Sequence, residues 1–510
     1  MKNLLLGILV LGTVVSACQK KEQEHADASK PNIVFIYTDD LGYGDIGIHG
    51  ATGVQTPHID KLAQDGLTFT DAHSSAATCT PSRYALLTGS YAFRRKAAIL
   101  PGDAPLIIDP QKETMPSMLQ KAGYKTAVVG KWHLGLGRGA VDWNKEITPG
   151  PAEVGFDYSF IIPATPDRVP CVFVENQKVA GLDPDDPIKI DYNKNISSYP
   201  IGLNHPELLK MPADSQHSGS IINGVSRIGY MKGGKKALWT DEKFPLVLTQ
   251  KAENFMQENK DRPFFLYFAL NDIHVPRMPN QQFVGKSDMG RRGDVIAEAD
   301  WVTGQVIQTL KKLGIEKNTL VIFSSDNGPI LDDGYEDQAE ELVGNHNPAG
   351  QFRGGKYSAY EAGTRMPTIV YWPGTVEQGV SHALVSQVDL YASLAQLTGQ
   401  ELGPEDAPDS FPLLDTWLGK SDKGREYMLE EAFTLAVRDG DWKYIAPQEN
   451  ETPDWLKNKA VETGLSNQIQ LYNLAQDPGE QHNVAAEHPE IVKKLQEKLN
   501  NIKRSPTREF

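Results

Sequence analysis

The sequence is poor in cysteine, with three in 510 residues: Cys18, Cys79 and Cys171. Exported proteins that depend on disulfides for stability normally carry more pairs than this. One disulfide between Cys79 and Cys171 is an alternative to two separate thiols. If Cys79 has a chemical role, Cys171 is expected to be a small buried apolar residue.

Positive charge is also scarce, since 51 Lys and Arg stand against 66 Asp and Glu, a formal net charge of -15. Nonspecific binding to nucleic acid requires positive charge along one face, so we expect no nucleic-acid partner. A small anionic substrate remains compatible with this composition, because a pocket can be locally positive on an acidic protein.

Long apolar runs are absent after the first few residues. Residues 4–15 form an apolar run behind a short basic start, and this run is too short for a typical membrane span. The sequence VSAC at 15–18 resembles a bacterial lipobox, which predicts a signal peptide over 1–18 and a lipid on Cys18; an ordinary signal peptide cut after Ala17 is the alternative. Residues 19–30 are polar and charged, as in a flexible tether. We therefore expect an exported lipoprotein, periplasmic or at the cell surface, that is held to the membrane through its lipid alone.

Several segments have the apolar, β-branched and aromatic content of buried strands. They are 33–38, 126–129, 264–270, 320–323 and 368–372. Stretches with helical spacing lie between the first four, at 59–66, 115–123 and 295–313. This alternation predicts an α/β fold with a largely parallel sheet covered by helices on both faces.

Polar residues follow four of these strands directly. They are Asp39 and Asp40, then Lys131 and His133, then His274, and last Asp326 and Asn327. Each group alone has a plainer interpretation, such as a solvated turn or a packed histidine. Open α/β sheets place their sites beyond the carboxyl ends of the strands, so the four groups together predict one active site.

The strongest local signal is CTPSR at 79–83, followed by YALLTG at 84–89. It resembles the modification motif of the sulfatase family, in which the cysteine becomes Cα-formylglycine, an aldehyde. Further matches occur in the family's order: DDLGYGD at 39–45, GKWHLG at 130–135, SDNG at 325–328 and RGGK at 353–356. The resemblance extends from about residue 31 to 495. It implies an alkaline-phosphatase-like fold: a large mixed, mostly parallel sheet flanked by helices, and a small C-terminal α+β subdomain with a short antiparallel sheet.

The resemblance also implies the chemistry. One hydroxyl of the hydrated aldehyde attacks the sulfur and displaces the alcohol. The other hydroxyl then loses its proton, and collapse to the aldehyde expels sulfate. A second attack by water on a hindered, anionic sulfur is thereby avoided, because one difficult step is split into two easier ones.

Asp39, Asp40, Asp326 and Asn327 offer oxygen ligands, which suit calcium or magnesium rather than zinc. With the hydroxyl formed from Cys79 they would hold one ion. Calcium is expected over magnesium because it accepts a crowded, irregular shell and because the resemblance implies it.

Roles for the remaining polar residues come from the resemblance. Arg83 and Lys131 would stabilise the hydrated formylglycine, and Lys131 would also contact sulfate. His133 would take the proton that releases sulfate. His274 and Lys356 would lie on the leaving-group side, with His274 as the general acid and Lys356 as a sulfate ligand that shares this role.

Two further positions are expected to contact the sugar. Asp167 and Arg168, in a proline-rich loop, would bracket vicinal hydroxyls, especially an axial one; a surface ion pair is the alternative. His346 precedes the loop that carries Lys356 and is expected to reach the substrate as well.

Domain boundaries follow from the same patterns. We expect a catalytic domain over 31–415 and a C-terminal subdomain over 416–510, with short strands in 427–445 and 471–474 and a closing helix over 489–502.

The sequence thus predicts a sulfuric ester hydrolase of sulfated carbohydrate, such as a glycosaminoglycan or an algal glycan, with 6-O-sulfated galactose or N-acetylgalactosamine as the expected unit. A sulfatase-maturating enzyme would be a partner during biogenesis. The alternatives are a phosphonate monoester hydrolase or phosphodiesterase of the same superfamily, and a noncatalytic glycan-binding lipoprotein, which would be expected to lose members of the site.

Overall fold

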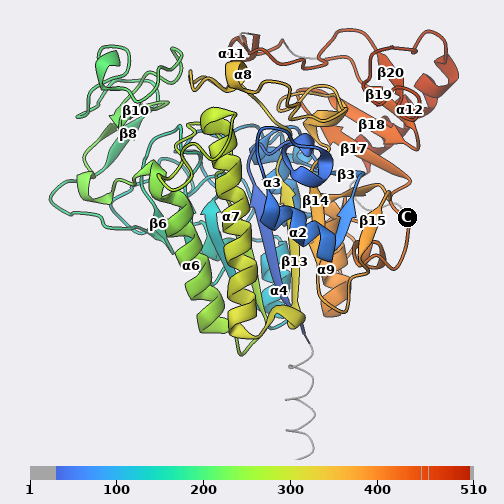
Figure 1. Ribbon diagram of the computed structural model, residues 1–510, viewed down its shortest axis with the longest axis horizontal. Helices are drawn as coiled ribbons and strands as arrows, with labels where there is room; N and C mark the ends of the chain where they lie inside the picture. Colours follow the sequence, from blue (N-terminus) through green and yellow to red (C-terminus); the bar gives the residue numbers. More distant parts are fainter. Residues whose placement is uncertain (1–29, 449–450, 458, 506–510) are drawn as a thin grey trace, which may run out of the picture.

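The centre of the molecule is a ten-stranded mixed sheet (Figure 1). The computed structural model describes residues 30–448, 451–457 and 459–505. In sheet order the strands are β15 (Gly379–Ser381), β2 (Leu67–Phe69), β14 (Thr368–Tyr371), β13 (Thr319–Ser325), β1 (Asn32–Thr38), β12 (Phe264–Ala269), β4 (Lys125–Lys131), β5 (Tyr158–Ile162), β6 (Val174–Glu175) and β7 (Lys178–Val179).

The middle of this sheet, β13-β1-β12-β4-β5, is parallel throughout. Every residue of β1 and of β12 is buried, as expected for strands covered on both faces. The predicted α/β fold with a mostly parallel sheet is therefore confirmed. The predicted segment at 368–372 is also a strand, but β14 runs antiparallel to β13 and to β2.

Helices cover both faces of the sheet. On one face α2 (Pro57–Asp65) and α6 (Phe244–Asn259) pack against α7 (Gly290–Leu313). On the other, α3 (Cys79–Thr88) and α4 (Met115–Lys121) pack against α9 (Leu390–Thr398). The predicted helices at 59–66, 115–123 and 295–313 are confirmed as α2, α4 and α7.

The C-terminal part forms a second, antiparallel sheet. Its strands are β17 (Tyr427–Glu431), β18 (Leu435–Asp439), β19 (Trp442–Ile445) and β20 (Gln470–Asn473), with α12 (Pro489–Arg504) packed on β18 and β19. This matches the predicted short sheet and closing helix. The boundary at residue 415 stays a prediction.

Shorter elements complete the described chain. The helices are α5 (Pro151–Val154), α8 (Ala339–Leu342), α10 (Leu414–Trp417) and α11 (Asp454–Lys457). The strands are β3 (Ala72–His73), β8 (Lys189–Asp191), β9 (Ile221–Ile222), β10 (Val225–Ser226), β11 (Tyr230–Lys232) and β16 (Val385–Ser386). The 3-10 helices are η1 (Tyr43–Asp45), η2 (Gly47–His49), η3 (Ala92–Arg95), η4 (Pro206–Leu208), η5 (Lys235–Ala237), η6 (Asp241–Lys243), η7 (Glu316–Asn318), η8 (Glu361–Gly363) and η9 (Gln387–Asp389).

The two sheets are joined directly beside Cys79. The amide of Ala77 donates to the carbonyl of Glu431 at 2.7 Å, and the amide of Glu431 donates to the carbonyl of Ser75 at 3.1 Å. The end of β17 therefore pairs with the segment that leads into α3.

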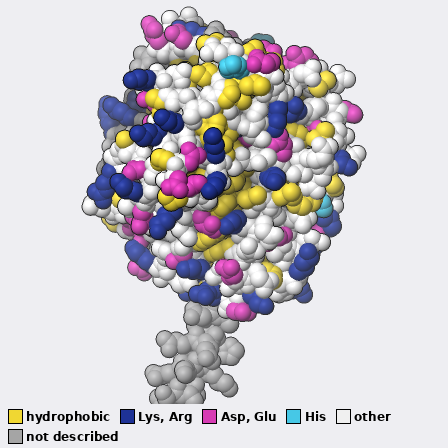
Figure 2. All heavy atoms as spheres, turned by 90° about the vertical axis from the view of Figure 1, so that its left-hand side faces the viewer, with side chains coloured by type: hydrophobic (Ala, Val, Ile, Leu, Met, Phe, Trp, Pro, Cys, Tyr) yellow, Lys and Arg dark blue, Asp and Glu magenta, His cyan; other side chains and the backbone are white. Residues whose placement is uncertain are grey.

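Cys79 and Cys171 are both free and buried, so the alternative of a disulfide between them is wrong. Cys171 is the expected small buried apolar residue. Among the described residues, no helix is long and apolar enough to span a bilayer. Charged side chains of both signs are interspersed on the face over β6, β8 and α6 (Figure 2).

Candidate active site

The carboxyl ends of the parallel strands bring the predicted polar residues to one edge of the sheet. Asp39 and Asp40 follow β1 directly, Lys131 is the last residue of β4, and Asp326 follows β13. The backbone links these ends: the amide of Asp39 donates to the carbonyl of Asp272 at 2.8 Å, and the amide of Asp326 donates to the carbonyl of Thr38 at 3.1 Å. The ends of β1, β12 and β13 therefore lie together, and Lys131 at the end of β4 joins them through its ion pair with Asp39.

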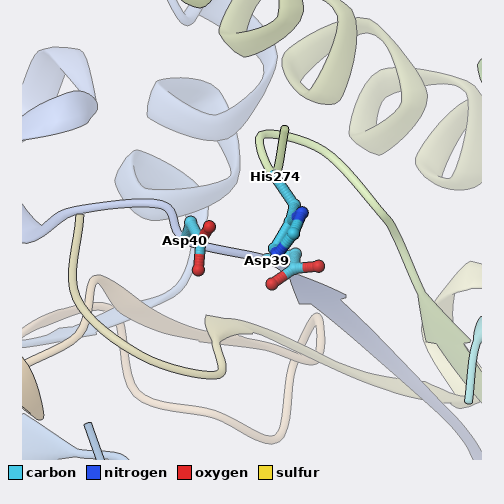
Figure 3. A group of neighbouring side chains, drawn as sticks. All are labelled: Asp39, Asp40 and His274. Atoms are coloured by element: carbon cyan, nitrogen blue, oxygen red, sulfur yellow. The ribbon is translucent and has the colours of Figure 1, made fainter. Parts of the chain in front are cut away.

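An oxygen cluster lies at the centre of this site. Asp39 and Asp40 sit beside His274, with one ligand atom of each within 4.8 Å of the others (Figure 3). Asn327 donates from Nδ2 to Oδ1 of Asp40 at 2.7 Å, which leaves its own Oδ1 pointing elsewhere. Within the described chain, Asn327 Oδ1 and Asp39 Oδ1 are buried without a hydrogen-bond partner.

The electrostatics of the cluster fit a bound cation. Burial, followed by the nearby carboxylate of Asp326, raises the pKa of Asp39 well above its ordinary value. Burial also raises the pKa of Asp40, against the opposing effect of Lys356. Buried oxygens that repel one another and lack donors are suited to a hard divalent ion such as calcium or magnesium.

Three buried cationic side chains surround the same carboxylates. Lys131 Nζ lies 2.5 Å from Asp39 Oδ2, and Arg83 Nη2 lies 2.8 Å from Asp326 Oδ2. Lys356 Nζ lies 2.8 Å from Asp40 and 2.9 Å from Asp333. Burial alone would raise the pKa of Asp326, but Arg83, Lys131 and Lys356 outweigh it and lower this pKa.

Cys79 is the first residue of α3 and is 2% exposed. Burial raises the pKa of its thiol, although Lys131 and Lys356 act in the opposite direction. A thiol with a raised pKa is a weak nucleophile, because the thiolate is the reactive form. The unmodified side chain is therefore poorly suited to attack a sulfate ester.

Both predicted catalytic histidines, His133 and His274, are held neutral. Burial, then the charge of Lys131, lowers the pKa of His133 well below its ordinary value. Burial, then Lys356 and Lys131, does the same to His274. The ring of His133 is 2.9 Å from the carbonyl of Leu100 through Nε2, while its buried Nδ1 has no partner among the described residues.

The ring of His274 has a fixed tautomer. Its Nδ1 is 2.6 Å from the carbonyl of Val275, so Nδ1 carries the proton and donates it. This leaves Nε2 as an acceptor. Lys356, in contrast, keeps its proton: burial alone would lower its pKa, but Asp333 and Asp40 raise it well above the ordinary value.

A pocket of about 460 Å³ opens over Cys79, His274 and Lys356. Asp167 and Arg168 line it and form an ion pair at 2.9 Å, so this pair lies in the pocket rather than on the outer surface. His217 also lines it, with Nε2 3.4 Å from Asp167 and Nδ1 2.7 Å from Asp214. Burial lowers the pKa of His217, but the hydrogen bonds that its ring donates to Asp167 and Asp214 outweigh this effect and raise the pKa.

Several residues of this pocket were missed by the sequence analysis. They are His217, Asp333, Tyr192, Tyr357, Glu431, Phe433 and Trp455. Asp333 and Tyr357 had a local signal, since Asp333 closely follows the SDNG motif and Tyr357 directly follows Lys356. The others lie far from the motifs in the sequence, so no local pattern reveals them.

His346 is not among the residues that line this pocket, and its contact with the substrate stays a prediction. Its Nε2 lies 2.8 Å from Asp45 Oδ1, and its Nδ1 accepts from the amide of Thr52 at 3.2 Å. Arg292 binds the same carboxylate of Asp45 at 2.6 Å. His346 thus helps to hold the loop after the first two carboxylates, and both of its ring nitrogens are already engaged.

The mostly parallel sheet, with an oxygen cluster and buried cations at its carboxyl edge, defines a hydrolase of the alkaline-phosphatase-like class. Residues 31–400 match the sulfatase family, and the chain belongs to that family. It is therefore a sulfuric ester hydrolase, and its family generally uses a formylglycine and a divalent metal ion.

The chain is similar to several known sulfatases. It is 50% identical to an N-acetylgalactosamine-6-O-sulfatase of Bacteroides thetaiotaomicron, across 99% of this chain and all of that protein. It is 32% identical to human arylsulfatase A, over 92% of this chain and 87% of that protein. A solved structure, described as part of glycosaminoglycan metabolism by Bacteroides thetaiotaomicron, superimposes with a TM-score of 0.91 at 51% identity and covers 94% of this chain and all of that one.

Proposed function

We propose that this protein is a carbohydrate sulfatase that removes the 6-O-sulfate of N-acetylgalactosamine or galactose units from glycosaminoglycans. The observation that carries the proposal is the shared pocket of Cys79, His274 and Lys356 with the ion pair of Asp167 and Arg168. The similarity to the Bacteroides N-acetylgalactosamine-6-O-sulfatase supports the choice of sugar.

The metal in this proposal is one calcium ion, held by Asp39, Asp40, Asp326 and Asn327 with the hydroxyl of a formylglycine derived from Cys79. The buried, unpartnered oxygens of Asp39 and Asn327 support this ligand set. When bound, the ion would supply positive charge to the sulfate and increase the acidity of the attacking hydroxyl.

The protein's own side chains divide the remaining work. Arg83 and Lys131, fixed by Asp326 and Asp39, orient the modified residue 79 at the start of α3. Lys356, which stays protonated, binds a sulfate oxygen and holds a proton for the leaving alcohol.

The two histidines would exchange protons with the reacting groups. His133 is neutral with a free Nδ1, so it is ready to take the proton that accompanies sulfate release. His274 also presents a neutral acceptor nitrogen in the free site. It would act as general acid only after the bound sulfate has raised its pKa, and until then Lys356 is the better proton donor.

The sugar would be recognised by Asp167 and Arg168 through two adjacent hydroxyls. A carboxylate accepts and a guanidinium donates, so the pair can bracket a vicinal diol. Because the ring of His217 also pairs with Asp167, the carboxylate keeps its orientation in the pocket.

The alternative of a phosphonate monoester hydrolase or phosphodiesterase lacks comparable support. The family match spans 31–400, and the similarity to named sulfatases covers nearly the whole chain. The alternative of a noncatalytic glycan-binding protein is not supported either, because every residue of the predicted catalytic set is present at the site.

Export as a lipoprotein through Cys18 is part of the proposal, with the protein periplasmic or at the cell surface; residues 1–29 lie outside the described chain. A sulfatase-maturating enzyme would be needed as a partner. Since Cys79 is 2% exposed in the folded protein, such an enzyme must act before the chain closes around it.

Two measurements test this proposal. The first is mass spectrometry of the tryptic peptide that contains Cys79, taken from protein made in its native host. The second is an assay of sulfate release from N-acetylgalactosamine-6-sulfate. We expect the mass of an aldehyde or its hydrate and activity that disappears in Cys79→Ala. An unmodified thiol in fully active protein would overturn the mechanism and reopen the phosphohydrolase alternative.

A further inference from the structure

The pocket over Cys79 continues onto the C-terminal sheet. Glu431, the last residue of β17, lines the same cavity as Cys79 and Lys356. Phe433 in the β17–β18 turn and Trp455 on α11 line it as well. None of these three side chains takes part in the sulfate chemistry derived above, so this half of the pocket has no function yet.

An aromatic cluster forms the wall of this half. The rings of Tyr357 and Trp455 lie 5.1 Å apart between centroids at 72°, and those of Phe433 and Trp455 lie 6.0 Å apart at 64°. Phe433 and Trp455 are only partly buried and also line the cavity. The face of an aromatic ring carries partial negative charge, which suits the C–H bonds on the apolar face of a sugar ring.

Glu431 adds a hydrogen-bonding group beside this wall. Its Oε2 accepts from the amide of Phe93 at 2.9 Å, the one side-chain hydrogen bond found for it within the described chain. Burial raises the pKa of this carboxyl to about 8, which favours its protonated, uncharged form. A protonated carboxyl both donates and accepts, as sugar hydroxyls do.

The charged side chains that line the pocket are mostly paired with one another. Arg168 is paired with Asp167, and Lys356 with Asp40 and Asp333. His217 is held between Asp167 and Asp214. Lys356 Nζ also lies 5.3 Å from the ring centroid of Tyr357, at the border of the aromatic wall. The lining residues 431–433, Pro453 and Trp455 include no cation, so they offer no partner to a second sulfate or to a uronate carboxylate.

We infer that Glu431, Phe433 and Trp455 form a second sugar-binding position, which takes an uncharged sugar ring linked to the sulfated one. This inference rests on the proposed function. The sulfated unit binds next to residue 79, and its neighbour stacks on Phe433 and Trp455 while its hydroxyls bond to Glu431. The substrate is thus recognised as a disaccharide unit, and the second sugar is selected for its lack of charge.

Steady-state kinetics of sulfate release on three substrates test this inference. They are N-acetylgalactosamine-6-sulfate, the same unit linked to a neutral hexose, and the same unit linked to glucuronate. For the formylglycine-containing wild type we expect kcat/KM to be about tenfold higher on the neutral disaccharide than on the monosaccharide, as for a buried aromatic anchor. The glucuronate disaccharide is expected to show no such gain.

Phe433→Ala and Trp455→Ala should remove this gain and leave kcat/KM on the monosaccharide unchanged within about twofold, a loss on the scale of one interface aromatic. Glu431→Gln, which keeps a donor and an acceptor, should retain most of the gain, whereas Glu431→Ala should lose it. Trp442→Ala is the matched control, because Trp442 belongs to the C-terminal sheet but packs on His488 outside the pocket.

The outcomes separate the two proposals. If the wild type releases sulfate from none of the three substrates, the proposed sugar specificity fails and the second position falls with it. If the wild type is active but gains nothing from the neutral neighbour, or if Phe433→Ala and Trp455→Ala impair all substrates equally, the second position alone is overturned.

Discussion

Gly130 shows how closely the chain is packed around the lysine that orients residue 79. It lies on β4 directly before Lys131, with a φ of 108°, and a Cβ at this position would meet the carbonyl oxygen of Ala269 at 1.8 Å. Since β4 pairs with β12 at this point, the strands must separate to admit any side chain.

Gly130→Ala is therefore expected to lower the free energy of unfolding by more than about 2 kcal/mol and to reduce kcat by displacing Lys131. Urea denaturation and sulfate release measure the two effects. The matched control is Gly399→Ala, because Gly399 also has a positive φ but meets no atom within 4 Å. Equal losses in the two variants would contradict a role for the contact with Ala269.

The oxygen cluster leads to a second prediction at this scale. A cation that binds the folded state alone stabilises it by about 2.7 kcal/mol at a free concentration of 100 times Kd. Calcium should therefore raise the Tm of protein treated with a chelator, magnesium should raise it less, and Asn327→Ala should reduce the calcium effect. Differential scanning fluorimetry measures this without reference to activity, and a Tm unaffected by calcium would argue against the site.

At the scale of elements, α2 depends on α7 for its cap. Thr56 at the N-terminus of α2 makes no capping bond with its side chain. Asp300 on α7 supplies the missing cap. The Oδ1 atom of Asp300 accepts hydrogen bonds from the amides of His58 and Ile59 at 2.9 and 2.8 Å. One carboxylate thus satisfies two amides that the helix leaves free and fixes the two helices to each other.

Removal of this cap should cost about 1–2 kcal/mol of unfolding free energy in Asp300→Ala. Asp300→Asn keeps an acceptor oxygen and should lose clearly less. Chemical denaturation of the two variants measures their unfolding free energies. An identical decrease in both would show that Asp300 stabilises the protein by packing rather than by capping α2.

A comparison of the elements with the sequence-based predictions shows which parts of the fold and of the site the sequence could predict. The parallel strands β1, β4, β12 and β13 were predicted because each is a contiguous apolar run, whereas β5, which pairs with β4, was not predicted. Their polar ends were predicted because strand and motif are adjacent in the chain. Glu431, Phe433 and Trp455 were not, because β17 reaches the pocket through backbone pairing with residues 75–77. His346 is not among the residues that line the pocket, because proximity in sequence to Lys356 does not establish proximity in space.

At the scale of the whole molecule, a buried ionic network joins the two sheets. Asp71, beside β3, binds Arg438 of β18 at 2.6 Å and Arg365 at 2.9 Å. Glu361 lies 3.1 Å from Lys443 of β19. Although Asp71, His73 and Glu361 lie close enough together to resemble a metal site, the guanidinium and ammonium groups already supply the positive charge.

This network makes the protein sensitive to acid. Burial would raise the pKa of Asp71, but His73, Arg365 and Arg438 outweigh it and hold this pKa well below its ordinary value. The stabilisation is therefore present above the pKa of about 3.9 of an unfolded aspartate, and it is lost as the pH falls below that value.

We expect the difference in unfolding free energy between the wild type and Asp71→Asn to shrink as the pH is lowered from about 6 to about 3. Denaturation by urea at successive pH values measures it. A difference that stays constant or grows toward low pH would show that Asp71 carries no charge-dependent stabilisation.

The direction of β1 has a consequence for where such a molecule can work. The described chain begins at Lys30, at the edge of the sheet opposite the pocket, and the seven residues of β1 rise about 23 Å from there toward Asp39 (Figure 1). An attachment through the N-terminus would join the protein on the side opposite the pocket, so the mouth of the pocket would lie away from the point of attachment. A long polymer could then be approached from above, without having to enter the space between the protein and the surface that carries it.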